Sequence, residues 1–198
     1  MRTGWVGLMF VVPVLFAGCE WWMGRPVKQS PGVLVSAEPA QTELESAPTF
    51  EKPGYQIKPL AKYKIKARIL SSERYRWDPG ADLVPVDLAV GWGAMSDTTV
   101  LDRLDIWQSG RWYEWRAKEF PIPPAEITSH SANMHLIAAD KSVAKQISRA
   151  RSGQVVTMKG YLVEASRADG FTWRSSLTRT DTGAGACELM WVTEFSVE

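Results

Sequence analysis

The amino-acid sequence predicts a β-rich domain, all-β or α+β in class, and within that class an OB-like, partly open barrel. Strand-like runs follow one another between residues 54 and 198, and one amphipathic helix precedes the last of them. An OB fold is a five-stranded Greek-key barrel with its helix between the third and fourth strands. A sandwich or another α+β arrangement of the same strands is the alternative.

The first half of the domain holds short strand-like segments separated by turns. Residues 63–69 alternate apolar and basic side chains, which is typical of a half-buried strand. Residues 87–92 form an apolar run expected to be a strand or a buried turn. Ser96 is expected to cap a short helix running to Leu104. Residues 106–115 are expected to form a hairpin that turns at Ser109-Gly110.

The last third of the chain gives the clearest pattern. Residues 132–138 are expected to form a strand. Asp140 is expected to cap a helix with apolar residues at positions i, i+4 and i+7, which Gly153 ends. A long strand over residues 154–165 and a closing strand over residues 187–197 complete the prediction.

The N-terminus predicts a membrane anchor. Residues 5–18 form an apolar run, long enough for a signal peptide and short for a transmembrane helix. The run ends in Ala17-Gly18-Cys19, which resembles a bacterial lipoprotein signal with Cys19 as the lipidated residue, although Phe16 stands where Leu is usual. An uncleaved transmembrane anchor is the alternative. In either case the domain faces the periplasm.

Residues 20–53 are expected to be a tether between this anchor and a single domain over residues 54–198. Five of the twelve prolines lie in the stretch, and no apolar periodicity runs through it. The tether is expected to hold the domain away from the bilayer.

Cys187 is expected to be buried and unreactive. If Cys19 carries lipid, Cys187 has no partner for an intramolecular disulfide. It begins an alternating stretch whose odd positions include Leu189, Trp191 and Phe195, so the thiol is expected to share a buried strand face with them.

Charge argues against a nucleic-acid-binding protein. The chain has 23 Lys and Arg against 22 Asp and Glu, and without Arg2 of the leader the two are equal. Proteins that bind phosphate backbones usually carry a clear excess of basic residues. No hydrolase signature occurs, and no cofactor is indicated.

Two clusters of polar residues are candidate ligand sites. The segment 129–135 contains both histidines, His130 and His135, together with Asn133. A spacing of five puts the histidines on opposite faces of a strand, which argues against a metal site. Hydrogen bonds to loop backbone are the alternative role for these side chains.

The second cluster is the segment 173–187. Arg174, Arg179 and Asp181 lie before two glycines and could bind an anion, although the glycine spacing is not that of a phosphate loop. A purely structural Arg179–Asp181 network is the alternative. If the strands carrying both clusters are neighbours, His130, Asn133, His135, Arg174 and Arg179 would line one polar concavity.

Several short segments of the chain resemble a group of uncharacterised, membrane-anchored proteobacterial proteins. The segments are DLAVGWG from Asp87, SGRW from Ser109, HSANMHLI from His130 and WRSSLTR…GACE from Trp173. The resemblance covers most of the chain beyond the leader. It implies a location in the cell envelope and transfers no catalytic residue.

The sequence therefore predicts a cell-envelope module with a binding or structural role, whose partner is an envelope protein or a small ligand. The alternative is an envelope enzyme with a polar site around His130 or His135 and Arg174 or Arg179. A concave site in which a histidine and a carboxylate converge would favour the enzyme.

Overall fold

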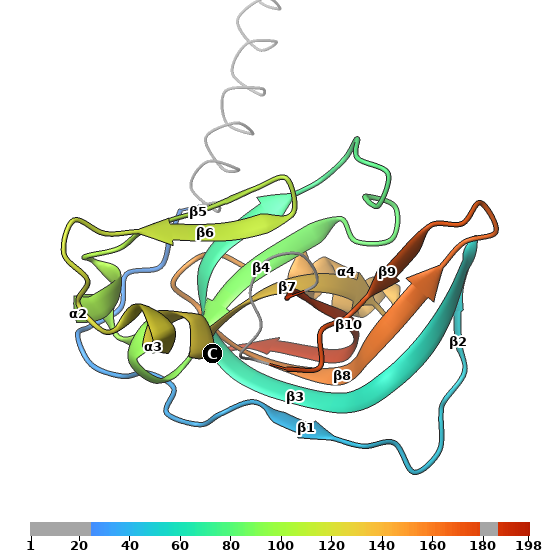
Figure 1. Ribbon diagram of the computed structural model, residues 1–198, viewed down its shortest axis with the longest axis horizontal. Helices are drawn as coiled ribbons and strands as arrows, with labels where there is room; N and C mark the ends of the chain where they lie inside the picture. Colours follow the sequence, from blue (N-terminus) through green and yellow to red (C-terminus); the bar gives the residue numbers. More distant parts are fainter. Residues whose placement is uncertain (1–24, 179–185) are drawn as a thin grey trace, which may run out of the picture.

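Figure 1 shows a computed structural model of the chain, which describes residues 25–178 and 186–198. Its centre is a bent sheet in which five strands close into a ring. These strands are β3 (Tyr55–Arg74), β4 (Val86–Gly91), β7 (Ser131–Ala138), β8 (Val155–Ser166) and β10 (Glu188–Val197).

The ring closes because β3, which is 20 residues long, pairs with β8 over its first part and with β4 over its last. The strand order is β3-β4-β7-β10-β8 and back to β3, with β7 and β10 parallel and the other neighbours antiparallel. Helix α4 (Lys141–Ile147) lies between the third and fourth ring strands. The predicted β-rich, OB-like fold is therefore confirmed, although register shifts in β3 and β10 make the ring irregular.

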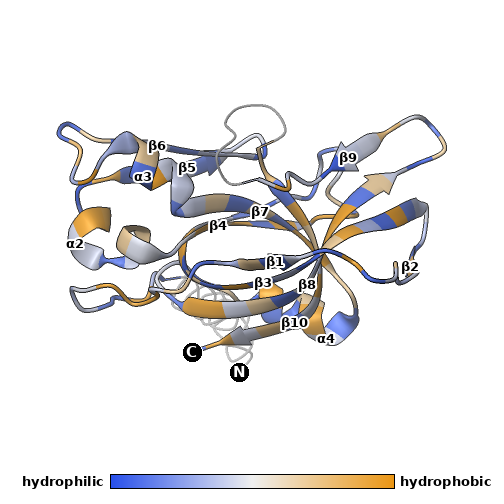
Figure 2. Ribbon diagram, turned by 60° about the horizontal axis from the view of Figure 1, so that its bottom comes forward, coloured by the Kyte–Doolittle hydropathy of each residue, from blue (hydrophilic) through white to orange (hydrophobic). Residues whose placement is uncertain are grey.

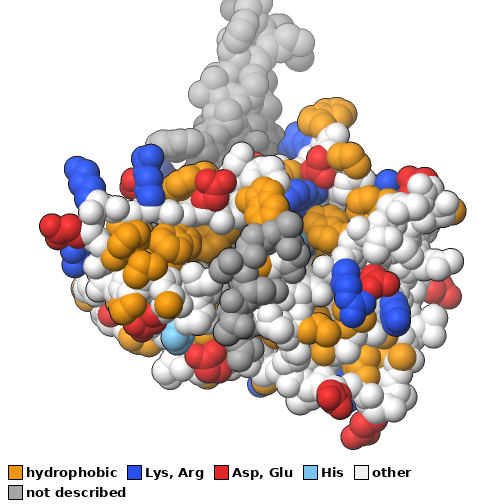
Figure 3. All heavy atoms as spheres, viewed as in Figure 1, with side chains coloured by type: hydrophobic (Ala, Val, Ile, Leu, Met, Phe, Trp, Pro, Cys, Tyr) orange, Lys and Arg blue, Asp and Glu red, His pale blue; other side chains and the backbone are white. Residues whose placement is uncertain are grey.

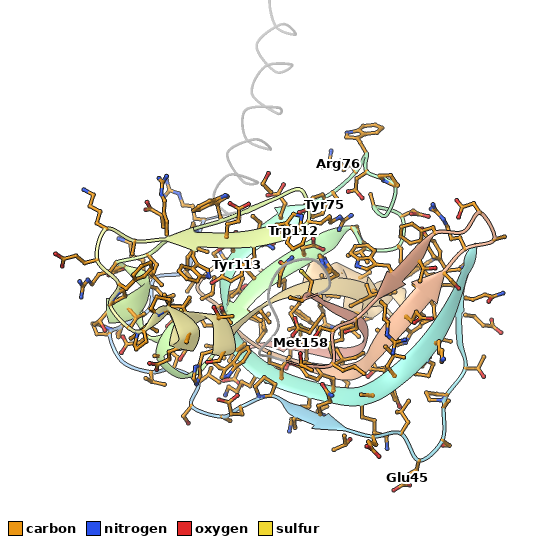
Figure 4. All side chains as sticks on the ribbon, in the orientation of Figure 1. Glu45, Tyr75, Arg76, Trp112, Tyr113 and Met158 are labelled. Carbon is orange, nitrogen blue, oxygen red and sulfur yellow. The ribbon has the colours of Figure 1, made fainter. Side chains whose placement is uncertain are left out.

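Alternation along the strands separates the inside of the ring from its outside. From Tyr63 to Ala67 buried residues of β3, which belong to the inner cluster, alternate with more exposed ones, and Figure 2 shows such alternation of hydropathy along the strands. Met158 lies inside the ring (Figure 4), in one apolar cluster with Met134 and Met190.

The outer face of β7 and β10 is also covered. Ile137, Leu189 and Trp191 belong to a second buried cluster on that face. A functional site on the outer face of β7 and β10 therefore requires a part of that face that neighbouring residues leave open.

The cover comes partly from a separate hairpin, β5 (Asp105–Ser109) and β6 (Trp112–Arg116), as the sequence predicts. Its turn lies one residue later than expected, at Gly110-Arg111, because Ser109 pairs with Trp112. Gly110 has a φ of 58° and Arg111 a φ of 72°, as a two-residue type I′ turn requires. The hairpin tip is held against β7 by a hydrogen bond from the Asn133 amide to the Arg111 carbonyl oxygen, 2.9 Å long.

The segment after β4 differs from the prediction. A 3-10 helix, η1 (Gly93–Ser96), ends at Ser96, and the following α2 (Thr98–Leu101) is capped by Asp97, whose carboxylate accepts from the Thr99 amide. The predicted Ser96 cap is therefore wrong. A further helix, α3 (Pro124–Ser129), begins with Pro124 and leads into β7.

Ser96 instead fastens the N-terminal segment to the ring. Its hydroxyl oxygen accepts hydrogen bonds from the backbone amides of Leu34 and Val35, at 3.1 and 3.0 Å. Val35 is 3% exposed and belongs to the apolar cluster of the ring.

The rest of the predicted tether also lies along the domain. Strands β1 (Ala40–Thr42) and β2 (Phe50–Lys52) both pair antiparallel with β3, and the Val27 amide donates to the Ser152 carbonyl oxygen. From Val27 onward this segment packs as a strap on the ring rather than as a free spacer.

The predicted anchor, with Cys19, lies outside the described residues. Within residues 25–178 and 186–198 there is no helix with the length and apolarity needed to cross a bilayer.

The predicted α4 is confirmed, and the closing strand is confirmed with one correction. The Asp140 carboxylate caps α4 by accepting from the Val143 amide at 2.9 Å. In β10 the register against β8 shifts between Val192 and Glu194, which turns Phe195 to the inner face of the ring. Phe195 therefore does not share the face of Leu189 and Trp191.

Candidate functional site

A pocket of about 520 Å³ opens on the outer side of the ring, beside β7. It is lined by residues 78–80 of the β3–β4 loop, residues 111–112 at the hairpin tip, His135, residues 171–174 and Cys187. We call it the Arg111 pocket. Figure 3 shows apolar side chains gathered around a cationic group on this face of the molecule.

Its position follows from the topology. β4 and β7 are the second and third strands of the ring, and the loops that close the pocket join the first strand to the second and the fourth to the fifth. In OB folds the face of strands two and three, flanked by these same two loops, is where ligands bind.

Arg111 is the centre of the polar network in the pocket wall. Its guanidinium donates to both carboxylate oxygens of Asp78, each at 2.8 Å, and to Oδ1 of Asp87 at 3.0 Å. It also donates to the Val84 carbonyl oxygen at 2.8 Å. One cation thus links the hairpin tip, the β3–β4 loop and a ring strand.

Tyr75 holds Arg111 from a further side. The guanidinium carbon lies 3.6 Å from the centroid of the Tyr75 ring, and the phenol oxygen accepts from the Arg111 amide at 3.1 Å. Figure 4 shows Tyr75 next to Trp112 at the end of the hairpin. Burial, together with the negative charge of Asp87, raises the pKa of Tyr75 to about 12.

Asp78 is the more exposed of the two carboxylates. Its partial burial would raise its pKa, but hydrogen bonds from Arg111 and from the Gly80 amide outweigh burial and lower the pKa of Asp78 below its ordinary value. Asp78 therefore stays ionised and fixes Arg111 at neutral pH.

Asp87 and His135 form a buried pair beneath the site, and of the two His135 lines the pocket. They face each other across β4 and β7, and His135 Nδ1 lies 2.9 Å from Asp87 Oδ1, outside hydrogen-bond geometry for the ring N–H. Asp87 is 0% exposed and His135 2% exposed. Asp87 Oδ2 and His135 Nδ1 have no hydrogen-bond partner among the described residues. Such buried, unpaired polar atoms are uncommon and often mark a ligand or water site.

Aromatic rings form the walls of the pocket. Trp173, in the short strand β9 (Thr172–Arg174), lies with its ring centroid 4.6 Å from that of His135 and 6.3 Å from that of Phe171. A Cβ atom at Gly80 would lie 3.0 Å from the Trp173 indole, so the indole rests on a position without a side chain. Trp112 closes the opposite side and is 43% exposed.

Cys187 is partly exposed and lines this pocket, so the predicted burial of its thiol is not what the structure shows. Its sulfur lies 3.7 Å from the Asn133 amide nitrogen. The predicted strand face is nevertheless present, because Leu189 pairs with His135 in the parallel register. Since residues two apart share a face, Cys187 and His135 lie on the same side of the sheet. The thiol escapes burial because it stands at the start of the strand, beside the pocket.

The structure brings together part of the predicted concavity. Asn133 and His135 lie on the same face, and Arg174 lines the pocket from its rim, where it pairs with Glu164. His130 lies elsewhere, at the end of α3, with its Nε2 3.3 Å from Glu38 and its Cδ2 packed against Gly93. Arg179 and Asp181 lie outside the described residues.

Asn133 has a positioning role. Its amide nitrogen donates to the Arg111 carbonyl oxygen, and its oxygen accepts from Gln108 at 2.8 Å. The side chain is 5% exposed and ties β5 and the turn of the hairpin to β7.

The sequence analysis missed Arg111, Asp78, Asp87 and Tyr75. Two signals were present for them: a carboxylate inside the apolar segment Val86–Gly91, and an arginine directly after glycine in a hairpin turn. A charge in a buried strand requires a partner. The fold decides which cation is the partner of Asp87, because Arg111 is 24 residues away in the sequence.

Among the described residues, no group of three or more His, Cys, Asp or Glu side chains is arranged to hold a metal ion. Comparison of the chain with protein-family models, with curated proteins and with solved structures gives no match.

Proposed function

We propose that this chain is a cell-envelope protein, held at a membrane by residues 1–19, whose OB-like domain faces the periplasm and binds a ligand in the Arg111 pocket. The role is binding rather than catalysis. The ligand is a small molecule or a group presented by an envelope component.

Two features of small-ligand sites occur together in the Arg111 pocket, and this coincidence supports the proposal. The pocket is in the size range of small-ligand sites, and aromatic walls from two separate loops enclose a few polar groups. The polar groups are held rigidly, because Arg111 is fixed by Asp78, Asp87 and Tyr75 before any ligand arrives. Preorganisation of this kind favours binding.

Photo-crosslinking in intact cells tests the site. Thr172 lines the pocket and is exposed, so a photoreactive phenylalanine analogue at position 172 should form adducts with the bound ligand. Trp107 is the control, because it is exposed on the β5–β6 hairpin and lies outside the pocket. Adducts from position 172 that position 107 does not give are expected. Identical adducts from both positions, or none from position 172, would contradict the proposal.

The membrane attachment is tested separately at Cys19. We expect palmitate to label the wild-type chain and not Cys19→Ser, and the mature wild-type protein to begin at Cys19. Equal labelling of the two, or a mature protein that still begins at Met1, would leave an uncleaved hydrophobic anchor as the mode of attachment.

The second candidate function is an envelope enzyme, and one observation favours it. His135, with Asp87 at its Nδ1 side, shares a pocket and a strand face with Cys187, and these are the residue types of a thiol nucleophile, its base and an orienting carboxylate. His130 is too far from the pocket to take part in this version of the site.

The rate of Cys187 alkylation by iodoacetamide at neutral pH separates the two functions. If His135 activates the thiol, His135→Gln should slow alkylation roughly tenfold or more, because the thiolate is the reacting form. A rate that is unchanged in a variant of unchanged melting temperature supports the binding function alone.

A further inference from the structure

We infer that the Arg111 pocket recognises uncharged sugar rings of an envelope glycan. This inference rests on the proposed binding function and adds the chemical class of the ligand.

The first argument is the position of the pocket on the barrel. The outer face of the second and third strands of OB folds, between the two flanking loops, accommodates oligonucleotides and oligosaccharides. Here β7 supplies His135 to the pocket, with residues 78–80 and 171–174 from the two loops. Both ligand classes are chains of rings, so the choice between them depends on charge.

Charge favours the uncharged chain. The cations that line the pocket are Arg111 and Arg174, and both are already paired, Arg111 with Asp78 and Asp87 and Arg174 with Glu164. A nucleic-acid groove needs cations that are available to phosphates. Among the described residues, both arginines of the lining are thus neutralised by carboxylate partners, and the whole chain has a formal net charge of +1.

The aromatic walls fit a sugar ring. Trp112 and Trp173 come from different elements and both line the opening, with Trp112 43% exposed. An aromatic face is electronegative, and the C–H groups on the flat side of a pyranose are weakly positive, so the two surfaces attract. Flat apolar faces also explain why rings rather than long apolar chains are favoured.

The floor of the site offers the hydrogen bonds that hydroxyl groups require. His135, Arg111 and Asp78 line the pocket, and their side chains are 2%, 16% and 30% exposed. Arg111 is a donor and Asp78 an acceptor. A hydroxyl both donates and accepts, so it can pair with either kind of group.

The test uses the full chain in a detergent without a sugar headgroup. The probes are tri-N-acetylchitotriose, followed by tryptophan fluorescence, and purified peptidoglycan and lipopolysaccharide, followed by co-sedimentation. Binding to peptidoglycan or to lipopolysaccharide identifies which source supplies the glycan. An oligothymidylate of similar length is titrated in parallel.

Trp173→Ala and Trp112→Ala should each weaken glycan binding roughly tenfold or more, as expected for loss of a stacking surface. Trp107→Ala, on the same hairpin and 36% exposed, should change it less than about twofold. Trp112→Ala keeps the test valid if Trp173→Ala does not fold, because Trp112 lies at the pocket mouth.

Three results would overturn the inference: no binding of any glycan probe, equal weakening by all three variants, or binding of oligothymidylate in place of glycans. If position 172 still forms specific adducts in cells under any of these results, the binding function stands and only the ligand class is wrong. If those adducts are also absent, the proposed function itself fails.

Discussion

Arg111 offers the sharpest test of how the site is held together. Arg111→Ala removes the cation that pairs with Asp87, which is 0% exposed, and leaves that carboxylate buried beside His135. Breaking a buried ion pair from one side typically costs about 3–5 kcal/mol. Loss of the contact with the Tyr75 ring adds about 0.5–1 kcal/mol. We therefore expect a loss of about 3–5 kcal/mol or slightly more in the free energy of unfolding.

The hairpin carries a matched control. Arg116 pairs with Asp105 at 3.0 Å, but the two side chains are 75% and 68% exposed. An exposed pair contributes about 0–1 kcal/mol, so Arg116→Ala should barely change stability. Adding Asp87→Asn to Arg111→Ala should restore a large part of the loss, because it removes the stranded charge.

The assay is urea unfolding of the full chain in detergent micelles, followed by tryptophan fluorescence. The midpoint should fall in Arg111→Ala while the slope stays constant. The reasoning is refuted if Arg111→Ala and Arg116→Ala have the same stability, or if Asp87→Asn brings no recovery.

Three further predictions concern the fold. Ser96→Ala should cost about 1–3 kcal/mol, because the Val35 amide is buried and loses its acceptor; faster hydrogen exchange at Val35 should accompany it, and unchanged exchange would contradict the strap. Asp140→Ala should cost about 1 kcal/mol through loss of the α4 cap, and Asp140→Asn much less; equal unfolding midpoints would disprove the cap. Burial raises the pKa of Tyr75 from 10.0 to about 12, so the neutral phenol stabilises the fold below pH 10 and that stability is lost as pH rises toward 12. Tyr75→Phe should flatten this alkaline loss in thermal unfolding, and an unchanged slope would show that Tyr75 is not responsible.

Much of the fold could be predicted because its signals are local. In α4 the apolar spacing, the Asp140 cap and the Gly153 stop all lie within one short segment, and each is found in the structure. The strand over residues 154–165 is predicted from its sequence in the same way. It pairs with a neighbouring strand on each side, and buried residues recur along it.

The strap could not be predicted in the same way. Residues 25–53 have no periodicity because they follow the ring as a line of single contacts, such as Val35 on Ser96 and Trp92 Nε1 on Glu38 at 2.9 Å. Composition alone makes such a segment look like a linker. These two contacts join residues that are 61 and 54 positions apart, which no local pattern reports.

The candidate site was only half predictable for a related reason. Asn133 and His135 stand out as polar residues in a strand, but their significance depends on Arg111 and Asp87, which reach them through the hairpin and a neighbouring strand. His130 has the same residue type as His135 and serves a loop instead. Residue identity suggested candidates, and chain topology selected among them.

Closure of the ring through β3 has a kinetic consequence. Ala61 of β3 pairs with Leu162 of β8, and β10, the last segment of the chain, is the strand that joins β7 to β8. Pairing β3 with β8 closes the long loop of chain between Ala61 and Leu162. The loss of chain entropy on closing this loop opposes folding until the strand pairing compensates for it. Chains dominated by such distant pairings fold on the order of milliseconds to seconds rather than microseconds. No nascent portion lacking residues 188–197 can complete the barrel, so the ring stays open until β10 is available.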